Sequence, residues 1–210
     1  SAINVRSTFK GTATTGDGSV PINGENAEAD GTDVLPTLYF VTQLAEGFSF
    51  GAFLNAPYAT GTDFGTDSVA RYQATESEIT GINGGVSVAF RVHDKVSIGG
   101  SMIAQYLKAR TAVAINTTAL CLGSLAPATC AGVGIDPSEL GNNTADGQFE
   151  MEGHNTAFGF AIGTLVEFTP HSRLGLNYRT RIAHDLTGTA NVSFPDSAST
   201  FTTLAGLDNT

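Results

Sequence analysis

Two cysteines are the residues of this 210-residue sequence whose chemistry is easiest to anticipate. Cys121 and Cys130 lie nine positions apart in the stretch CLGSLAPATC, which is rich in Gly, Ala, Pro and Thr. The spacing is not the CxxC of a zinc site, and no histidine lies nearby to complete a ligand set. The pattern favours a disulfide that closes a loop in an oxidising compartment, with free buried thiols as the alternative.

Four histidines could in principle act as general bases. None of them has a Ser, Cys or Asp partner at catalytic spacing, so we interpret each as a turn or interface residue: His93, His154, His171 and His184. The sequence therefore predicts no enzyme activity, no metal site and no cofactor.

The overall charge excludes one class of partner. The formal net charge is −10, and the ten Lys and Arg residues are dispersed, so no basic stripe is available for nucleic acid. No run of 18 apolar residues could form a transmembrane helix, and the start SAINVRSTFKG lacks the apolar core of a signal peptide. If the protein is exported, we expect its signal to have been removed.

Long stretches of alternating polarity dominate the rest of the chain. In residues 173–194, even positions such as Leu174, Leu176 and Tyr178 are apolar, whereas odd positions include Arg179 and Arg181. The same alternation recurs in residues 78–92, 95–115 and 155–168, and the polar face is built largely from small residues. A soluble sandwich packs large side chains inside, whereas a membrane barrel turns its apolar face outward, so the pattern favours a barrel.

The connections support the same interpretation. We expect seven strands, over residues 2–13, 34–44, 48–64, 74–92, 95–115, 149–168 and 173–194. The linking segments alternate between very short turns and long loops at 15–33, 65–76 and 116–147, as in outer-membrane barrels. Seven strands leave two open edges, which lipid does not tolerate, so we expect residues 1–210 to be part of one larger antiparallel β-barrel domain.

The long loops hold most of the acidic residues. A solvated rim is one interpretation, and contact with divalent cations or lipopolysaccharide is the other.

The sequence resembles the outer-membrane channels for hydrophobic compounds, typified by the long-chain fatty acid transporter, a fourteen-stranded barrel. The resemblance rests on residues 35–64, 95–110 and 159–182 and follows the order of the hairpins. It implies an outer-membrane location in a Gram-negative bacterium, a monomer, and capture of a lipophilic substrate in a pocket within the barrel. The amino-terminal plug of that family, with its Asn-Pro-Ala motif, and its carboxy-terminal strands are not found in this sequence.

The resemblance also implies a role for Pro57, which interrupts the apolar strand 48–64. In this family the substrate leaves sideways through an opening made by a kink in the third strand. A proline removes one hydrogen bond of the ladder, so we expect a lateral gate here, with no transport role for the proline as the alternative. The rim residues would be Phe53, Asn55, Ala56, Pro57 and Tyr58.

The substrate is less well defined by the resemblance. The first hypothesis is uptake of long-chain fatty acids. The fifth strand has Val113 at the position that we match to an inward-facing arginine of the family, which weakens the case for carboxylate binding and makes an uncharged or aromatic substrate the alternative. Candidate ligand-contacting residues in the lumen are Ile103, Gln105, Arg179 and Arg181, although the arginines could instead pair with Glu167 or Asp185. A general porin is the second hypothesis, and a surface adhesin or enzyme on a barrel is the third.

Overall fold

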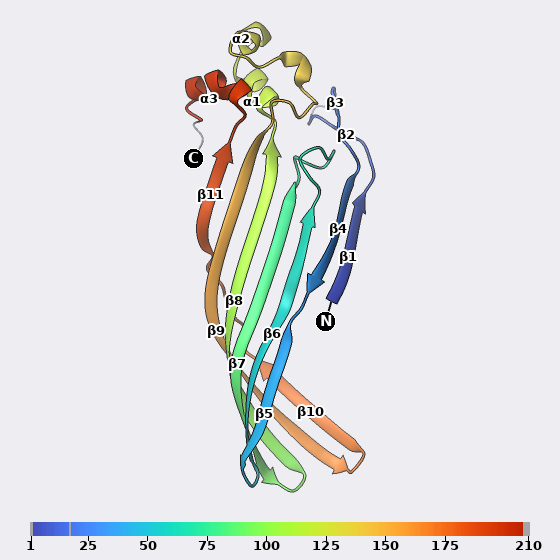
Figure 1. Cartoon of the computed structure of the whole chain (residues 1–210), viewed down its shortest axis with the longest axis vertical. Coiled ribbons are helices and arrows are strands. Elements are labelled where there is room, and N and C mark those ends of the chain that lie inside the picture. The colour runs from blue at the N-terminus through green and yellow to red at the C-terminus, as the bar shows by residue number, and fades with distance from the viewer. Residues whose placement is uncertain (1, 17, 208–210) are drawn as a thin grey trace.

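The computed structural model describes residues 2–16 and 18–207, and a seven-stranded antiparallel sheet forms most of it (Figure 1). The strands lie in the order β10-β9-β8-β7-β6-β5, and β11 pairs with β9 beyond β10. Their bounds are β5 (Thr37–Ala45), β6 (Phe48–Asp63), β7 (Glu76–His93), β8 (Val96–Ile115), β9 (Gly147–Thr169), β10 (Ser172–Arg179) and β11 (Thr187–Ser193).

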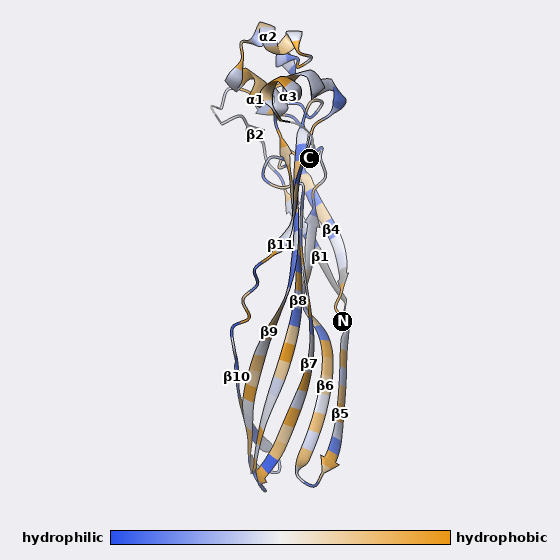
Figure 2. Cartoon of the chain, turned by 90° about the vertical axis from the view of Figure 1, so that its left-hand side faces the viewer, coloured by the Kyte–Doolittle hydropathy of each residue, from blue (hydrophilic) through white to orange (hydrophobic). Residues whose placement is uncertain are grey.

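The sheet has two chemically different faces, because side chains alternate along each strand. We call the face of Val86, Val88, Phe158, Phe160 and Ile162 the apolar face; these side chains are 40–70% exposed. We call the opposite face the inner face; it carries Asn83, Gly85, Ile103, Gln105 and Gly159, all of them well covered. Hydrophobic residues are concentrated in the half of the sheet away from the helices (Figure 2).

Short turns and long loops segregate to opposite ends of the sheet, as the sequence predicts (Figure 1). The turn between β5 and β6 is Glu46–Gly47, with Gly47 at φ 73°, a conformation that favours glycine. The loop end carries α1 (Thr117–Ser124), α2 (Pro127–Gly132), η1 (Pro137–Glu139), η2 (Asp196–Ala198) and α3 (Ser199–Ala205). Residues of α1, α2, η2 and α3 contribute to a small buried cluster that includes Ile135, Phe194 and Phe201.

Within the part of the chain that the structure describes, no helix is long and apolar enough to cross a membrane.

The amino-terminal region differs from the prediction. The strand expected over 2–13 is β1 (Ala2–Phe9), and the expected loop 15–33 contains β4 (Ala27–Val34), which pairs with β1 in a separate two-stranded sheet. The short strands β2 (Ala13–Thr14) and β3 (Pro21–Ile22) pair at the loop end. Prediction missed β4 because its buried residues are the alanines 27 and 29, whose alternation with acidic residues carries little apolar signal.

The prediction of one continuous strand over 173–194 is wrong. Both β10 and β11 pair with β9, but residues 180–186 between them have no ladder pairing. Arg179 lies opposite Ala161 and Thr187 lies opposite His154, so seven residues span the six residues 155–160 of β9. The extra residue inverts the alternation: the inner face is reached by odd positions in β10 and by even positions in β11.

Candidate functional site at two interruptions of the sheet

The interruption at Pro57 is a bulge in β6. Asn55 lies opposite Asn83 of β7 and Tyr58 lies opposite Gly81, so Ala56 and Pro57 together face the single residue Ile82. Because opposed residues share a face, Asn55 and Tyr58 both point to the inner face although three positions separate them. The inward side chains of β6 are therefore at odd positions before the proline and at even positions after it.

The other edge of β6 loses its partner at the same level. Pairing with β5 ends at Asn55, and the last bond runs from the Ala56 amide to the Pro36 carbonyl at 3.1 Å. Beyond it, residues 58–63 pair with β7 alone among the described strands. Beside this unpaired edge lies β4, which belongs to the other sheet (Figure 1).

Aromatic side chains flank the bulge on the inner face and lie over glycines. An added Cβ on Gly85 would overlap Cζ of Phe53, and one on Gly81 would lie 2.8 Å from Cδ2 of Tyr58. Only glycine leaves room for these rings at the two positions. Ala56 is buried at 9% exposure, whereas Pro57 is exposed.

A row of amide side chains and one imidazole crosses the inner face from this bulge; we call it the amide row and define it as Asn55, Asn83, Gln105, His184 and Asn155. Gln105 Nε2 donates to Asn83 Oδ1 at 2.7 Å. The His184 ring lies 3.0 Å from Gln105 Oε1 through Nε2 and 3.2 Å from Asn155 Oδ1 through Nδ1. Asn83 and Gln105 are 2% and 6% exposed, so the centre of the row is buried, whereas Asn55, His184 and Asn155 are half-buried.

The amide row ends at the second interruption, residues 180–186. Ile182 lies over Gly159, where an added Cβ would come within 2.6 Å of Cγ1 of Ile182. The segment therefore turns onto the inner face. The alternation of residues 173–194 predicts that Ile182, an even position, shares the lipid-facing side with Leu176 and Tyr178, and this prediction is wrong. Thr180 keeps one ladder-like contact, because its amide donates to the Phe160 carbonyl at 2.9 Å and its hydroxyl accepts from the Phe160 amide at 3.0 Å.

The two predicted arginines lie beside this segment. Arg179 is on the inner face opposite Ala161, and both Arg179 and Arg181 are exposed. Glu167, one of their expected partners, instead forms an ion pair with Arg173 at 3.3 Å.

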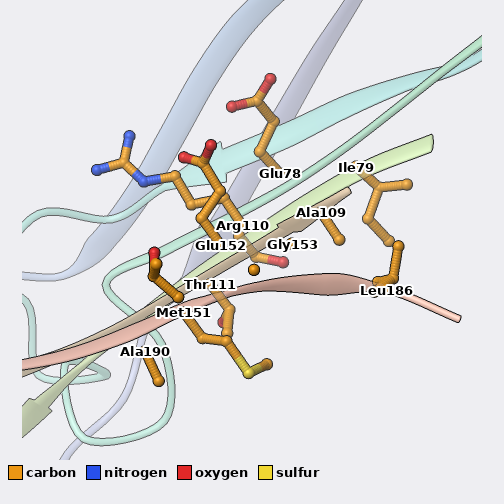
Figure 3. A pocket seen from close by; sticks show the side chains of 13 residues that line it. Glu78, Ile79, Ala109, Arg110, Thr111, Met151, Glu152, Gly153, Leu186 and Ala190 are labelled. Atoms are coloured by element: carbon orange, nitrogen blue, oxygen red, sulfur yellow. The ribbon is translucent and has the colours of Figure 1, made fainter. Parts of the chain in front are cut away.

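A hollow of about 360 Å³ lies on the inner face (Figure 3). Its lining includes Leu186 and Gly153, each two residues from a member of the amide row in the direction of the loop end. Ile79, Met151 and Leu186 contribute its apolar lining. Glu78 and Glu152 project to the other side of the strands in the same view. The arrangement suits an apolar ligand better than a charged one.

The loop end is held by one buried ion pair. The Arg71 guanidinium is fully buried, and its Nε lies 2.8 Å from Oδ2 of Asp146. Its Nη atoms donate to the carbonyls of Asn23 and Gly141, so it joins all three long loops. Burial raises the pKa of Asp146 above its usual value, against opposing hydrogen bonds, and raises that of Tyr72, whose hydroxyl therefore stays protonated and donates to Asp146.

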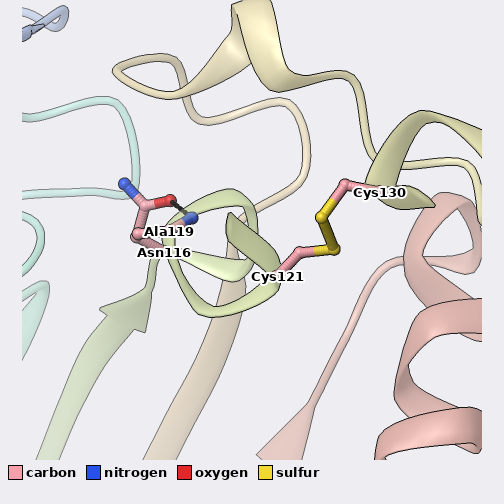
Figure 4. The surroundings of a disulfide bond; sticks show 4 residues. All are labelled: Asn116, Ala119, Cys121 and Cys130. Atoms are coloured by element: carbon pink, nitrogen blue, oxygen red, sulfur yellow. Dashed lines mark hydrogen bonds between the residues drawn. A yellow bond between two sulfur atoms is a disulfide. The ribbon is translucent and has the colours of Figure 1, made fainter. Parts of the chain in front are cut away.

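The two cysteines form a disulfide between α1 and α2, which is the pairing that the sequence favours (Figure 4). Their Cα atoms are 6.0 Å apart, and both residues are fully buried in the loop-end cluster. Asn116 caps α1 by accepting from the Ala119 amide at 2.8 Å. The disulfide thus orders the loop 116–147 and lies away from the inner face.

Several residues predicted from the sequence are brought together, and others of the same patch were missed. Phe53, Asn55 and Tyr58 lie on the inner face with Ile103 and Gln105, because the strand register aligns them. Asn83 and His184 were not predicted as site residues. Asn83 could have been found from its position among small inward residues, but His184 could not, since its inward position depends on the extra residue in 180–186.

Comparison with known proteins gives a consistent result. A family model described as outer membrane protein transport protein (OMPP1/FadL/TodX) matches residues 1–209. The long-chain fatty acid transport protein of Escherichia coli O6:H1 is 30% identical over 177 residues, which cover 81% of this chain and 39% of that protein. Outer membrane protein P1 of Haemophilus influenzae is 24% identical over 158 residues, covering 73% of this chain and 34% of that protein.

Solved structures share the fold. A Pseudomonas aeruginosa FadL homologue superposes with a TM-score of 0.76 at 20% identity, over 98% of this chain and 47% of that one. The toluene transporter TodX of Pseudomonas putida gives a TM-score of 0.59 at 19% identity, over 92% of this chain and 49% of that one. The chain therefore spans less than half the length of these relatives.

Proposed function

Because this chain belongs to the OMPP1/FadL/TodX family of outer-membrane transport proteins, whose β-barrels lie in the Gram-negative outer membrane, we propose that it takes part in the uptake of hydrophobic compounds. Long-chain fatty acids are the first candidate substrates, since relatives that match most of the chain carry that name. The family consists of transporters and channels, and we propose transport without catalysis here as well.

We further propose that the substrate is captured on the inner face and released sideways through the interruption at Pro57. The observation that supports this is the coincidence, at one level of β6, of a bulge and an unpaired edge. Phe53 and Tyr58 lie over glycines on the inner side, and Pro57 is exposed. A hydrophobe would meet apolar surface along this route and would not cross water.

Uncharged or aromatic hydrophobes are the second candidate substrates. The amide row contains no lysine, arginine or acidic residue, and Val113 lies opposite Phe149 at the outer part of β8. A general porin is less well supported, because a selective aqueous pore usually carries rings of charged side chains at its constriction.

The experiment compares Pro57→Val with Pro170→Val, a matched change in the exposed turn between β9 and β10. The protein that contains this chain is expressed in the outer membrane, and uptake of a radiolabelled long-chain fatty acid and of a monoaromatic hydrocarbon is measured. We expect Pro57→Val to straighten β6 and slow uptake without loss of assembled barrel, and Pro170→Val to have no effect. Normal uptake by Pro57→Val would refute lateral release at this bulge, and no uptake of either compound by the wild type would refute the transport function.

A further inference from the structure

We propose that the amide row binds an uncharged, hydroxyl-bearing head group at the end of an otherwise apolar substrate. Alcohols and protonated carboxylic acids belong to this class of ligand. The inference depends on the proposed function, because it assumes that a hydrophobic compound enters the inner face.

The first argument is an incomplete set of hydrogen bonds at Asn55. Its Oδ1 is buried and has no hydrogen-bond partner among the described residues. Its Nδ2 makes only a long contact of 3.5 Å to the Tyr39 hydroxyl. The rest of the row is internally bonded through Gln105 and His184. A buried acceptor without a donor is costly, and a ligand hydroxyl that donates to it would remove that cost.

The second argument is charge. The row consists of three asparagines, a glutamine and a histidine. Lys108 and Arg110 follow Gln105 along β8, but they lie on the opposite face and pair with Glu152 and Glu150. A carboxylate brought here would lose its water, while the two arginines beside residues 182–186, Arg179 and Arg181, are exposed and are not held within the row. A carboxylate also only accepts hydrogen bonds, so it cannot satisfy an acceptor such as Asn55 Oδ1. A hydroxyl both donates and accepts.

The third argument is position. Asn55 lies between Phe53 and Tyr58, the two rings that flank the bulge, and Asn83 lies opposite it. Apolar side chains continue on either side, since Ile103 is 5% exposed beside the row and Ile79 and Leu186 line the adjoining hollow. A head group held at Asn55 would leave its hydrocarbon chain against apolar surface. The row would thus orient the substrate at the lateral opening before release.

The test uses three eight-carbon probes that share their apolar chain: 1-octanol, octanoate at pH 8 and octane. Binding of each radiolabelled probe to the barrel protein that contains this chain, kept soluble in amphipol, is measured by equilibrium dialysis. The variant is Asn55→Leu, which removes the unpartnered amide and keeps a similar volume. The matched control is Asn177→Leu, an exposed asparagine on the inner face of β10, outside the row.

We expect wild-type protein and Asn177→Leu to bind 1-octanol about tenfold more tightly than octane or octanoate, the factor that one additional buried hydrogen bond supplies. Asn55→Leu should bind octanol and octane equally well and keep its affinity for octane, which also shows that it is folded. Equal binding of octanol and octane by the wild type would overturn the inference and leave transport of hydrophobes intact. Preference for octanoate, for instance through Arg179 and Arg181, would also overturn it. Failure of all three probes to bind would instead count against the proposed function.

Discussion

At the residue scale, Arg71 is a side chain that connects the three long loops at the loop end. It is fully buried, pairs with Asp146, and satisfies carbonyl groups of two other loops. Removing one partner of a buried ion pair leaves the other charge uncompensated, which typically costs about 3–5 kcal/mol. The three long loops should therefore separate without this guanidinium.

We predict that Arg71→Met makes the loops sensitive to proteinase K added to intact cells, where the wild type resists cleavage. Arg6→Met is the control, because the Arg6–Glu28 pair is long at 3.6 Å and both side chains are about half exposed or more. Such a surface pair contributes less than about 1 kcal/mol, so this variant should resist cleavage. Equal resistance of Arg71→Met and wild type would show that other contacts hold the loops.

At the scale of elements, inward glycines determine where neighbouring side chains can lie. Gly159 provides the space into which Ile182 turns, and so allows His184 to reach Gln105. We predict that Gly159→Val displaces residues 180–186. Overpacking at this position should lower the free energy of unfolding by about 1–3 kcal/mol. Amide hydrogen exchange of this segment should become faster.

Gly175→Val in β10 is the matched control. An added Cβ there meets nothing nearer than Leu165 Cδ1 at 3.9 Å, so hydrogen exchange of residues 180–186 should stay as in the wild type. If Gly159→Val also left the exchange unchanged, the contact of Ile182 with Gly159 would not be what holds the segment inward.

The sequence predicts the regular elements of this fold well and its irregular ones poorly. Strands β5 to β9 lie within three residues of their expected bounds at each end, because their alternation is strong and uninterrupted. The break after Arg179 was missed, since the alternation in the sequence continues through it while the ladder does not. Pro57 indicates the bulge in β6 directly, because proline has no amide hydrogen to donate to the ladder. No residue type within 180–186 indicates a break in the same way.

The same distinction between regular and irregular elements applies to the residues of the candidate site. Residues on regular strands, such as Ile103 and Gln105, could be placed on a face from alternation alone. The contact of His184 with Gln105 depends on a strand that turns inward, and its partners are 29 and 79 positions away in the chain. Long-range contacts of this kind follow from register and packing and not from local pattern.

At the scale of the whole molecule, the apolar face is the surface expected to meet lipid. Phe160 is 53% exposed on that face, in the half of the sheet where hydrophobic residues are concentrated. We predict that Phe160→Arg reduces the free energy of unfolding from lipid vesicles by about 2–4 kcal/mol, so that the barrel is less stable. This is the cost of arginine near the bilayer midplane of a barrel. The urea midpoint of unfolding from vesicles measures this.

Asn177→Arg, on the exposed inner face, should leave the urea midpoint near that of the wild type. An equal loss of stability in both variants would indicate that charge, and not its position in lipid, is responsible. A normal midpoint for Phe160→Arg would place this part of the apolar face outside the hydrocarbon.

The extra residue in each interruption also determines where the chain can be shortened. Two residues of β6 face one residue of β7 at Pro57, and seven residues face six at 180–186, so a single-codon deletion at either place leaves both flanks in their present register. A deletion at Val88 or Met102 would move every later residue of that strand to the opposite face. In a scan of single-codon deletions through the middle of the strands, away from the register shifts at the short turns, we expect assembled barrel only for deletions at Pro57 and within 180–186. The two interruptions are thus the points at which insertions and deletions could accumulate in this family without disturbing the wall.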